Sequence, residues 1–481
     1  MVLKLAHISD LHFSPGVSSG GRHLHSVPHL MGIEALLARE APNWLVASGD
    51  ITNNGDVESL LRAKGWLFDK VPLEGNKETG LRFRPECTVL IPGNHDAWNG
   101  SVSGDIHVRW QRSLENYQLV FGDGFADGRF EFTDPYHCDY DWIEADDFDI
   151  YIARVDSSFI GEGKDAEGVV PSFDRIACGN ISIEQSQRLL DWVDRGLKGR
   201  LPKRRKGTDE IIDRDRFRKS LKILVMHHYI FDPFGSTRDP LMDIKNGEIV
   251  FRNLMMADFD LILCGHKHKA CVQEHVYGDY LDERSRRRCL LNIFRQFVGL
   301  HAEPLATAGR KVPWMLLFFT RLAARHRPKG FDPNEAIEAL RKAISNPDSL
   351  HANVRAIFGT GLAQAEILDK HELTDIRRAL DNISKAERLV LAQKAAIYIN
   401  ECLNHLEKKP LVQIMSGSSA KAGESKQRSV NLYTIRRNNA QIDVELRRFD
   451  WRETSGADVA GGEFVLRETT VKPFRDDRHG H

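Results

Sequence analysis

The chain has 481 residues, of which 41% are hydrophobic and 28% charged, a composition that excludes a wholly disordered protein. Its 67 Lys and Arg residues nearly balance its 68 Asp and Glu residues. The whole molecule therefore has no electrostatic preference for nucleic acid or an anionic membrane, and any such preference must come from local clusters. A chain of this length predicts two or three domains, or one large domain with an insertion.

The cysteines and the apolar runs indicate the expected compartment. Seven cysteines are scattered without a Cys-x-x-Cys pair, which predicts free, buried thiols in a reducing environment. No signal peptide is expected, because Lys4, His7 and Asp10 interrupt the first apolar run. The longest apolar run, Trp314–Phe319, is far shorter than the ~20 residues of a membrane helix. We therefore expect a cytoplasmic protein without a transmembrane segment.

The first half of the chain alternates short apolar runs with helical patterns, as in a mixed α/β protein. Strands are expected at Val2–Ser9, Trp44–Ser48, Cys87–Ile91, Phe148–Val155, Ser220–Met226 and Leu261–Cys264. Helices are expected at Pro28–Glu40, Val57–Lys70 and Val108–Phe121. Ser182 and Gln185 form a capping box, which predicts that a further helix begins there.

The pattern changes after about residue 285. Residues 286–408 show helical periodicity, with a helix start at Asp332 and Pro333 and a second capping box at Ser384–Glu387. Strand patterns return at Leu411–Met415, Val430–Ile435 and Ile442–Leu446, with one further candidate at Phe464–Leu466. We therefore expect a core at residues 1–285, a helical insertion or cap at 286–408, and final strands that complete the core at 409–481, followed by a loose charged tail.

Five of the predicted strands end in side chains that bind metal ions. These side chains are Asp10 and His12, Asp50, Asn94 and His95, His227, and His266 and His268. In α/β sheets such groups gather where strands finish, because the strands fix their positions and the loops are free. Carboxylate, amide and imidazole ligands suit Mn, Fe or Zn, and the absence of thiolates argues against a structural cysteine-zinc site.

The set is large enough for two ions. Two ions about 3.5–4 Å apart need a shared carboxylate and further ligands for each, with room left for water and substrate. Residues two apart on an extended chain project the same way, so Asp10 and His12 are expected to share a face. His227 and His228 are adjacent, so only one of them is expected to face the ions.

These residues form a pattern that resembles the calcineurin-like metallophosphoesterase superfamily. The motifs are Asp10-Leu11-His12, Gly49-Asp50, Gly93-Asn94-His95-Asp96, His227 and Gly265-His266-Lys267-His268, in that order. The resemblance covers residues 1–280 and 410–450 and implies a β-sandwich flanked by helices, with αββα layers. The segment 286–408 matches nothing in the shared core of that superfamily.

The resemblance also implies the ligand set and the chemistry. Asp50 would bridge two divalent or mixed-valence ions (Mn, Fe or Zn), with Asp10, His12 and His268 on one ion and Asn94, His227 and His266 on the other. A metal-bridging hydroxide would attack a phosphate ester. His95 would protonate or stabilise the leaving alkoxide. Asp96 would either orient His95 or cap the turn.

Some sequences point to one branch of the superfamily. The run from Gly49 to Gly55, the Asp156-Ser157-Ser158 sequence, the Gly179–Ser182 segment and the paired histidines look like the cyclic-nucleotide phosphodiesterases. The expected substrate is thus a small phosphodiester. A nuclease and a phosphomonoesterase are the alternatives within the superfamily, and a non-catalytic scaffold is a third, disfavoured because every expected ligand is present.

Other polar residues have simpler explanations. His7 is expected to be a packed core or pocket-wall histidine. His23, His25 and His29 belong to the first loop, where a solvated position is favoured over a contact with substrate. Basic clusters at Lys198–Lys206 and Arg284–Arg327 leave nucleic acid open as a partner, although solvated helix and loop surfaces explain them more simply.

Overall fold

A computed structural model describes residues 2–14, 26–72, 78–97, 114–122, 138–158, 179–203, 210–231, 257–276, 410–420, 427–439, 441–454 and 461–475. By its contacts the chain divides into two compact units, Met1–His275 with Leu411–His481, and Val276–Pro410. The described residues lie almost entirely in the first unit. His23, His25 and the predicted helical segment 286–408 lie outside the described residues, so the expectations for them stay predictions.

The first sheet has the strand order β14-β13-β12-β1-β2-β5. Its strands are β1 (Leu3–Ile8), β2 (Trp44–Ser48), β5 (Thr88–Ile91), β12 (Ser429–Asn438), β13 (Gln441–Thr454) and β14 (Gly461–Arg475). The strands β1, β2 and β5 are parallel, whereas β12, β13 and β14 form an antiparallel meander that joins the sheet at β1. The carboxyl ends of β1, β2 and β5 therefore lie at one edge.

The second sheet has the order β10-β11-β9-β8-β7-β6. Its strands are β6 (Cys138–Glu144), β7 (Asp149–Val155), β8 (Leu221–Val225), β9 (Leu261–Cys264), β10 (Cys271–Val276) and β11 (Pro410–Met415). The strands β7, β8, β9 and β11 are parallel. Their carboxyl ends also share one edge, as the alternation of strand and helix in the sequence predicts.

Capped helices connect these strands. The helices are α1 (Val27–Glu40), α2 (Val57–Phe68), α3 (Asn94–Ala97), a π-helical turn η3 (Gln118–Gly122), α5 (Ile183–Leu197) and α6 (Arg214–Lys219). A 3-10 turn η2 (Pro85–Cys87) and a small hairpin of β3 (Val71–Pro72) and β4 (Glu78–Thr79) complete the described elements. The predicted capping box is present: the Ser182 hydroxyl accepts from the Gln185 amide, and the Gln185 side chain accepts from the Ser182 amide.

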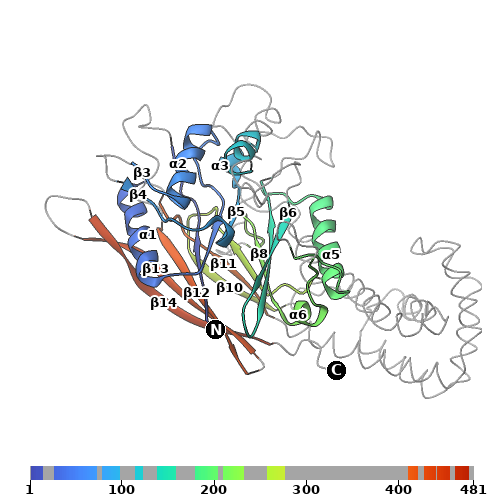
Figure 1. The fold of residues 1–481 in the computed structure, drawn as a ribbon. Helices are drawn as coiled ribbons and strands as arrows, with labels where there is room; N and C mark the ends of the chain where they lie inside the picture. The colour runs from blue at the N-terminus through green and yellow to red at the C-terminus, as the bar shows by residue number, and fades with distance from the viewer. Residues whose placement is uncertain are drawn as a thin grey trace, which may run out of the picture. The chain divides into compact units, whose positions relative to one another are not determined.

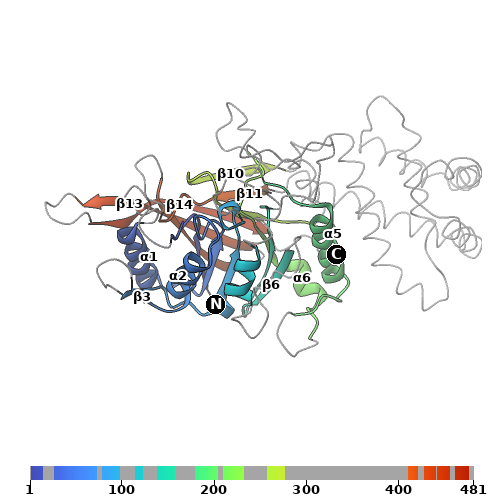
Figure 2. The same cartoon turned by 90° about the horizontal axis from the view of Figure 1, so that it is seen from above.

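Two apolar cores produce a layered αββα arrangement, which confirms the expected fold class. One core joins the first sheet to α1 and α2, and the other fills the space between the two sheets. Along β1, Ala6 and Ile8 belong to the first core, and Leu3 and Leu5 belong to the second. Helices α5 and α6 pack on the outer face of the second sheet, where Phe217 of α6 meets Tyr151 of β7. Figures 1 and 2 show the two helical layers on opposite sides of the strands.

The C-terminal region is more ordered than the sequence suggested. Only a short strand was expected near Phe464, followed by a loose tail. Instead β13 and β14 pair over their full lengths, through a register shift at Arg448 and Phe449. Outside Phe464–Leu466, β14 consists mainly of charged residues, threonines and glycines, so its apolar content is too low to stand out in the sequence.

His29 was expected in a loop, and that expectation is wrong. The residue lies in α1, is 5% exposed, and packs edge-on against Trp451 with ring centroids 4.4 Å apart. The structure confirms that His7 is a core histidine. Its ring is fully buried and hydrogen-bonds to the Ser48 and Tyr433 hydroxyls.

Candidate metal centre

The carboxyl ends of strands from both sheets meet at one cluster of polar side chains. The first sheet contributes Asp10 after β1, Asp50 after β2 and Asn94 after β5. The second sheet contributes His227 after β8 and the two histidines after β9. Three overlapping groups hold their ligand atoms within 4.8 Å of one another: Asp10, His12 and His268; His12, Asp50 and His95; and Asp50, His227 and His266. The structure therefore brings together the residues that the motifs predicted.

Asp50 lies between two of these groups. Its Oδ2 atom is 3.7 Å from His12 Nε2, and its Oδ1 atom is 3.3 Å from His227 Nε2. The side chain is 1% exposed. Burial alone would raise the pKa of this carboxyl, but His227, His95 and His12 outweigh burial and hold the pKa well below its usual value. Asp50 is therefore a charged carboxylate whose two oxygens face different sets of nitrogen donors.

Asn94 joins the second group through its amide oxygen. This oxygen lies 3.1 Å from His227 Nε2 and 3.0 Å from His266 Nδ1, and the two ring nitrogens are 3.2 Å apart. On the other side of the cluster, Asp10 Oδ1 lies 3.9 Å from His12 Nε2 and 3.7 Å from His268 Nδ1. The two halves match the two ligand sets that the family pattern implies.

The backbone at these positions is unusual. Asp10, His12, Asp50, His266 and His268 all have φ between 50° and 74°, in the left-handed region. Non-glycine residues in this region cost of order 1 kcal/mol each and cluster at functional sites. Asp10 and His12 lie in one group, as expected, but the chain is not extended at these two positions, so the reason given for that expectation is wrong. Left-handed turns after the strands bring the side chains together instead.

His227 and His228 make different contacts, although both lie in the bend that follows β8 and not in the strand itself. His227 Nδ1 donates to the Ser48 carbonyl oxygen at 2.8 Å, which directs Nε2 toward Asp50 and Asn94. Burial lowers the pKa of His227, but the negative charge of Asp50 outweighs it and raises this pKa to about 9. His228 is also buried, and its ring lies beside that of His266, with centroids 4.3 Å apart.

Ser157 fixes the loop that carries these two histidines, a role that the sequence did not reveal. Its hydroxyl oxygen accepts from the amides of His227 and His228 at 3.2 and 3.1 Å. It also lies 2.9 Å from His228 Nδ1. Because the oxygen already accepts two N–H groups, its own proton is directed to Nδ1. Ser157 follows β7, so a neighbouring strand positions the end of β8.

His95 is the half-buried histidine of the cluster. Its ring lies edge-on to that of His12, with centroids 4.8 Å apart, and its Nδ1 donates to the Asn53 carbonyl oxygen at 3.0 Å. That hydrogen bond occupies Nδ1 and orients the ring. The sequence singled out Asp96 as a possible orienting group, but the Asn53 carbonyl takes this position.

Asp96 caps the turn instead. Its carboxylate accepts from the amides of Ile51, Thr52 and Gly93 at 2.7–3.0 Å and from the Thr52 hydroxyl at 2.8 Å. Burial, and then the charge of Asp50, raise the pKa of Asp96 to about 6, while the hydrogen bonds oppose the shift. Asp96 thus ties the loop after β2 to the loop after β5, and its contacts favour the capping alternative over a proton-transfer role.

Gly93 permits the close approach of those two loops. A Cβ atom at this position would lie 2.3 Å from both the amide nitrogen and Oδ1 of Asp50. Any side chain here would therefore displace the carboxylate at the centre of the cluster.

The residues fit a pair of metal ions. Asn94 Oδ1 and Asp50 Oδ1 can only accept hydrogen bonds, and they converge with His227 Nε2 where each of the three residues is at most 6% exposed. Buried acceptors that face one another are stable only around a cation or a shared proton. Seven oxygen and nitrogen donors without a thiolate suit Mn, Fe or Zn.

Among the comparisons with known proteins, a family sequence model identifies the family. No curated protein matches the chain. Among solved structures, one described as "GAP50 the anchor in the inner membrane complex of Plasmodium" is 13% identical, with a TM-score of 0.32 over 56% of this chain and 68% of that one. A sequence model of the calcineurin-like phosphoesterases matches residues 3–270, more than half of the chain, in the region that supplies the whole cluster. The chain belongs to the calcineurin-like phosphoesterase family.

Proposed function

We propose that this protein is a dimetal phosphodiesterase that hydrolyses a small phosphodiester such as a cyclic nucleotide. The observation that carries the proposal is the position of Asp50, whose two oxygens face His12 on one side and His227 on the other. A carboxylate so placed can bridge two ions. When bound, such ions lower the pKa of water and stabilise charge on the phosphoryl group.

The protein's own groups complete the reaction. His95 reaches the substrate through Nε2, because Nδ1 is held by the Asn53 carbonyl. It delivers a proton to the leaving oxygen, a role typically worth ~10²–10⁴ in rate. The small cyclic substrate is supported by the Gly49–Gly55 and Gly179–Ser182 sequences, which look like those of the cyclic-nucleotide branch.

A substrate panel tests the proposal. The purified protein, supplied with Mn²⁺, is assayed on cyclic AMP, bis-p-nitrophenyl phosphate, p-nitrophenyl phosphate and single-stranded DNA. The diesters should be hydrolysed, and Asp50→Asn should lose both activity and bound metal, since the bridge is removed. Asp215→Asn, at an exposed residue of α6, is the matched control and should keep both.

Two results would overturn the assignment. Activity on DNA alone, with a steep loss as salt rises, would indicate a nuclease. Failure to bind metal after reconstitution, together with no hydrolysis of any ester, would indicate a scaffold.

A further inference from the structure

A cavity lies at the amino-terminal ends of β2 and β5, whereas the metal centre lies at their carboxyl ends. Its volume is about 570 Å³. It is bounded by the C-terminal half of α1, by Asn43 just before β2, and by residues 80–87 that lead into β5. The candidate ligands Asp50 and Asn94 follow the other ends of β2 and β5. A five-residue strand spans ~17 Å, so the two sites are separate.

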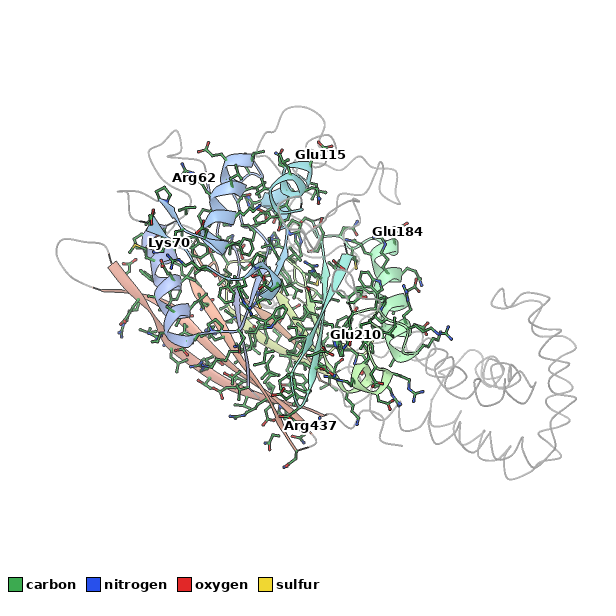
Figure 3. The ribbon with its side chains drawn as sticks, in the orientation of Figure 1. Arg62, Lys70, Glu115, Glu184, Glu210 and Arg437 are labelled. Carbon is green, nitrogen blue, oxygen red and sulfur yellow. The ribbon has the colours of Figure 1, made fainter. Side chains whose placement is uncertain are left out.

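The lining of this cavity is rich in positive charge. Lys70, Arg82 and Arg84 border it, against a single carboxylate, Glu34, which accepts a hydrogen bond from the Thr79 hydroxyl. Arg84 lies 3.5 Å from Glu86, but both side chains are more than half exposed and the pair is weak. Within the described part of the chain, Lys70 and Arg82 have no ion pair. Figure 3 labels Lys70 on this side of the molecule, near α1.

Apart from Asn43 and Glu34, the remaining lining residues are mostly apolar. Leu37, Pro42, Leu81 and Phe83 contribute to the wall, next to the three cationic groups. Arg82 has a φ of 54°, in the left-handed region. This strained conformation, like those of the metal centre, is of the kind that persists at ligand sites. A wall of this composition matches a molecule that has both an anionic group and an apolar body.

We propose that this cavity binds a small organic phosphate monoester. Its phosphate would lie among Lys70, Arg82 and Arg84, where a planar guanidinium can make two parallel hydrogen bonds to phosphate oxygens. Its apolar or aromatic body would lie on Leu37, Pro42 and Phe83. The volume falls in the usual 300–1,000 Å³ range of small-molecule sites, and two or more converging cations favour a dianion over a monocarboxylate.

Calorimetric titration with AMP tests the site. The protein used is the full chain carrying Asp50→Asn, with EDTA present, so that the metal centre cannot bind phosphate and the outcome does not depend on the proposed hydrolysis. AMP should bind saturably with a Kd below about 1 mM. Adenosine and inorganic phosphate should each bind more weakly, since each lacks one half of the recognised chemistry.

Charge variants locate the binding. Lys70→Gln and Arg82→Gln should each weaken AMP binding about tenfold, the usual effect of losing one charge-assisted hydrogen bond. Arg62→Gln removes the same charge from α2, outside the cavity, and should leave the affinity unchanged. Arg62 and Lys70 are marked in Figure 3. Absence of saturable AMP binding, or equal affinities for all three variants, would overturn the proposal.

Discussion

Asp50 shows how single residues define this centre. The carboxylate is buried, yet three histidines hold its pKa well below the usual value, so it keeps its negative charge. A buried charge of this kind is costly unless a positive partner offsets it. Among the described residues, the groups that offset the charge of Asp50 are the histidines His227, His95 and His12, and the charge of a histidine depends on pH. A pair of divalent cations would offset the charge at any pH where the histidines are neutral.

The role of His95 can be separated from metal binding. His95→Ala should lower kcat by ~10²–10⁴ on a diester with an alkoxide leaving group, because a general acid is lost. The decrease in kcat should be smaller for a p-nitrophenyl ester, because the p-nitrophenolate leaving group does not need a proton. Metal content, measured by elemental analysis, should stay at the wild-type level. Equal losses on both substrates would contradict proton transfer by His95.

The buried His7 makes the free energy of unfolding depend on pH. Burial lowers its pKa from 6.5 to about 3, so below pH 6.5 the unfolded chain binds a proton that the folded chain does not. The stabilisation that the neutral ring contributes is fully present above pH 6.5 and is lost progressively as the pH falls toward 3, by as much as about 5 kcal/mol.

His7→Gln should reduce that dependence. In urea unfolding with EDTA present, the variant should be less stable than wild type at pH 7.5, because it packs less well. The difference between the two proteins should narrow as the pH is lowered to 4. A constant difference across this range would show that His7 is not the titrating group.

At the level of elements, the loops after the strands are held by neighbouring strands. Ser157 follows β7 and binds the amides of His227 and His228 after β8. Similarly, the Ser418 hydroxyl after β11 donates to the Asp10 carbonyl oxygen at 3.0 Å. These hydrogen bonds fix the loops in positions that isolated turns would not keep.

The Ser157 contacts should be measurable as metal affinity. Ser157→Ala leaves two buried amides without their acceptor, and loss of such supporting groups typically costs 10–100-fold in metal affinity. Ser157→Thr keeps the hydroxyl and should restore most of it. Mn²⁺ titration by calorimetry gives the comparison without reference to activity. An unchanged Mn²⁺ affinity in Ser157→Ala would contradict a role of Ser157 in positioning the metal ligands.

Most strands, and the order of the candidate ligands along the chain, were predictable from the sequence. Apolar runs such as Leu261–Cys264 are short and fully buried, and they end at polar residues. Three kinds of feature were not predictable. The strand β10 is half-buried and lacks a clear alternation, so its pattern is weak. The left-handed turns at Asp10 and His266 arise from tertiary contacts that no local preference indicates. The Asn53 carbonyl is a backbone group, and backbone roles leave no signature in residue type.

At the scale of the whole molecule, the chain leaves and re-enters the second sheet at adjacent strands. β10 ends at Val276, β11 begins at Pro410, and the two are hydrogen-bonded neighbours. Among the described residues, no helix is long and apolar enough to cross a membrane. The expectation that residues 286–408 form a helical insertion leads to a direct test.

Replacing residues 277–409 by a Gly/Ser linker should leave the core intact. About ten such residues span ~17 Å, enough to join neighbouring strands. The shortened protein should unfold cooperatively and bind Mn²⁺ with the wild-type stoichiometry. A chain that stops at residue 409 is the counterpart, and it should fail to fold, since it lacks β11 beside β9 and β12 beside β1. Loss of folding in the shortened protein would contradict an independent insertion.

The donor cluster draws on both sheets: Asp10, Asp50 and Asn94 come from one layer, and His227, His266 and His268 from the other. Cations held there would link the two layers, because separating the layers would break the coordinate bonds to one of them. Resistance to heat and proteases would then follow the free-metal concentration of the surroundings, and a chelator would loosen the very interface that the apolar core builds.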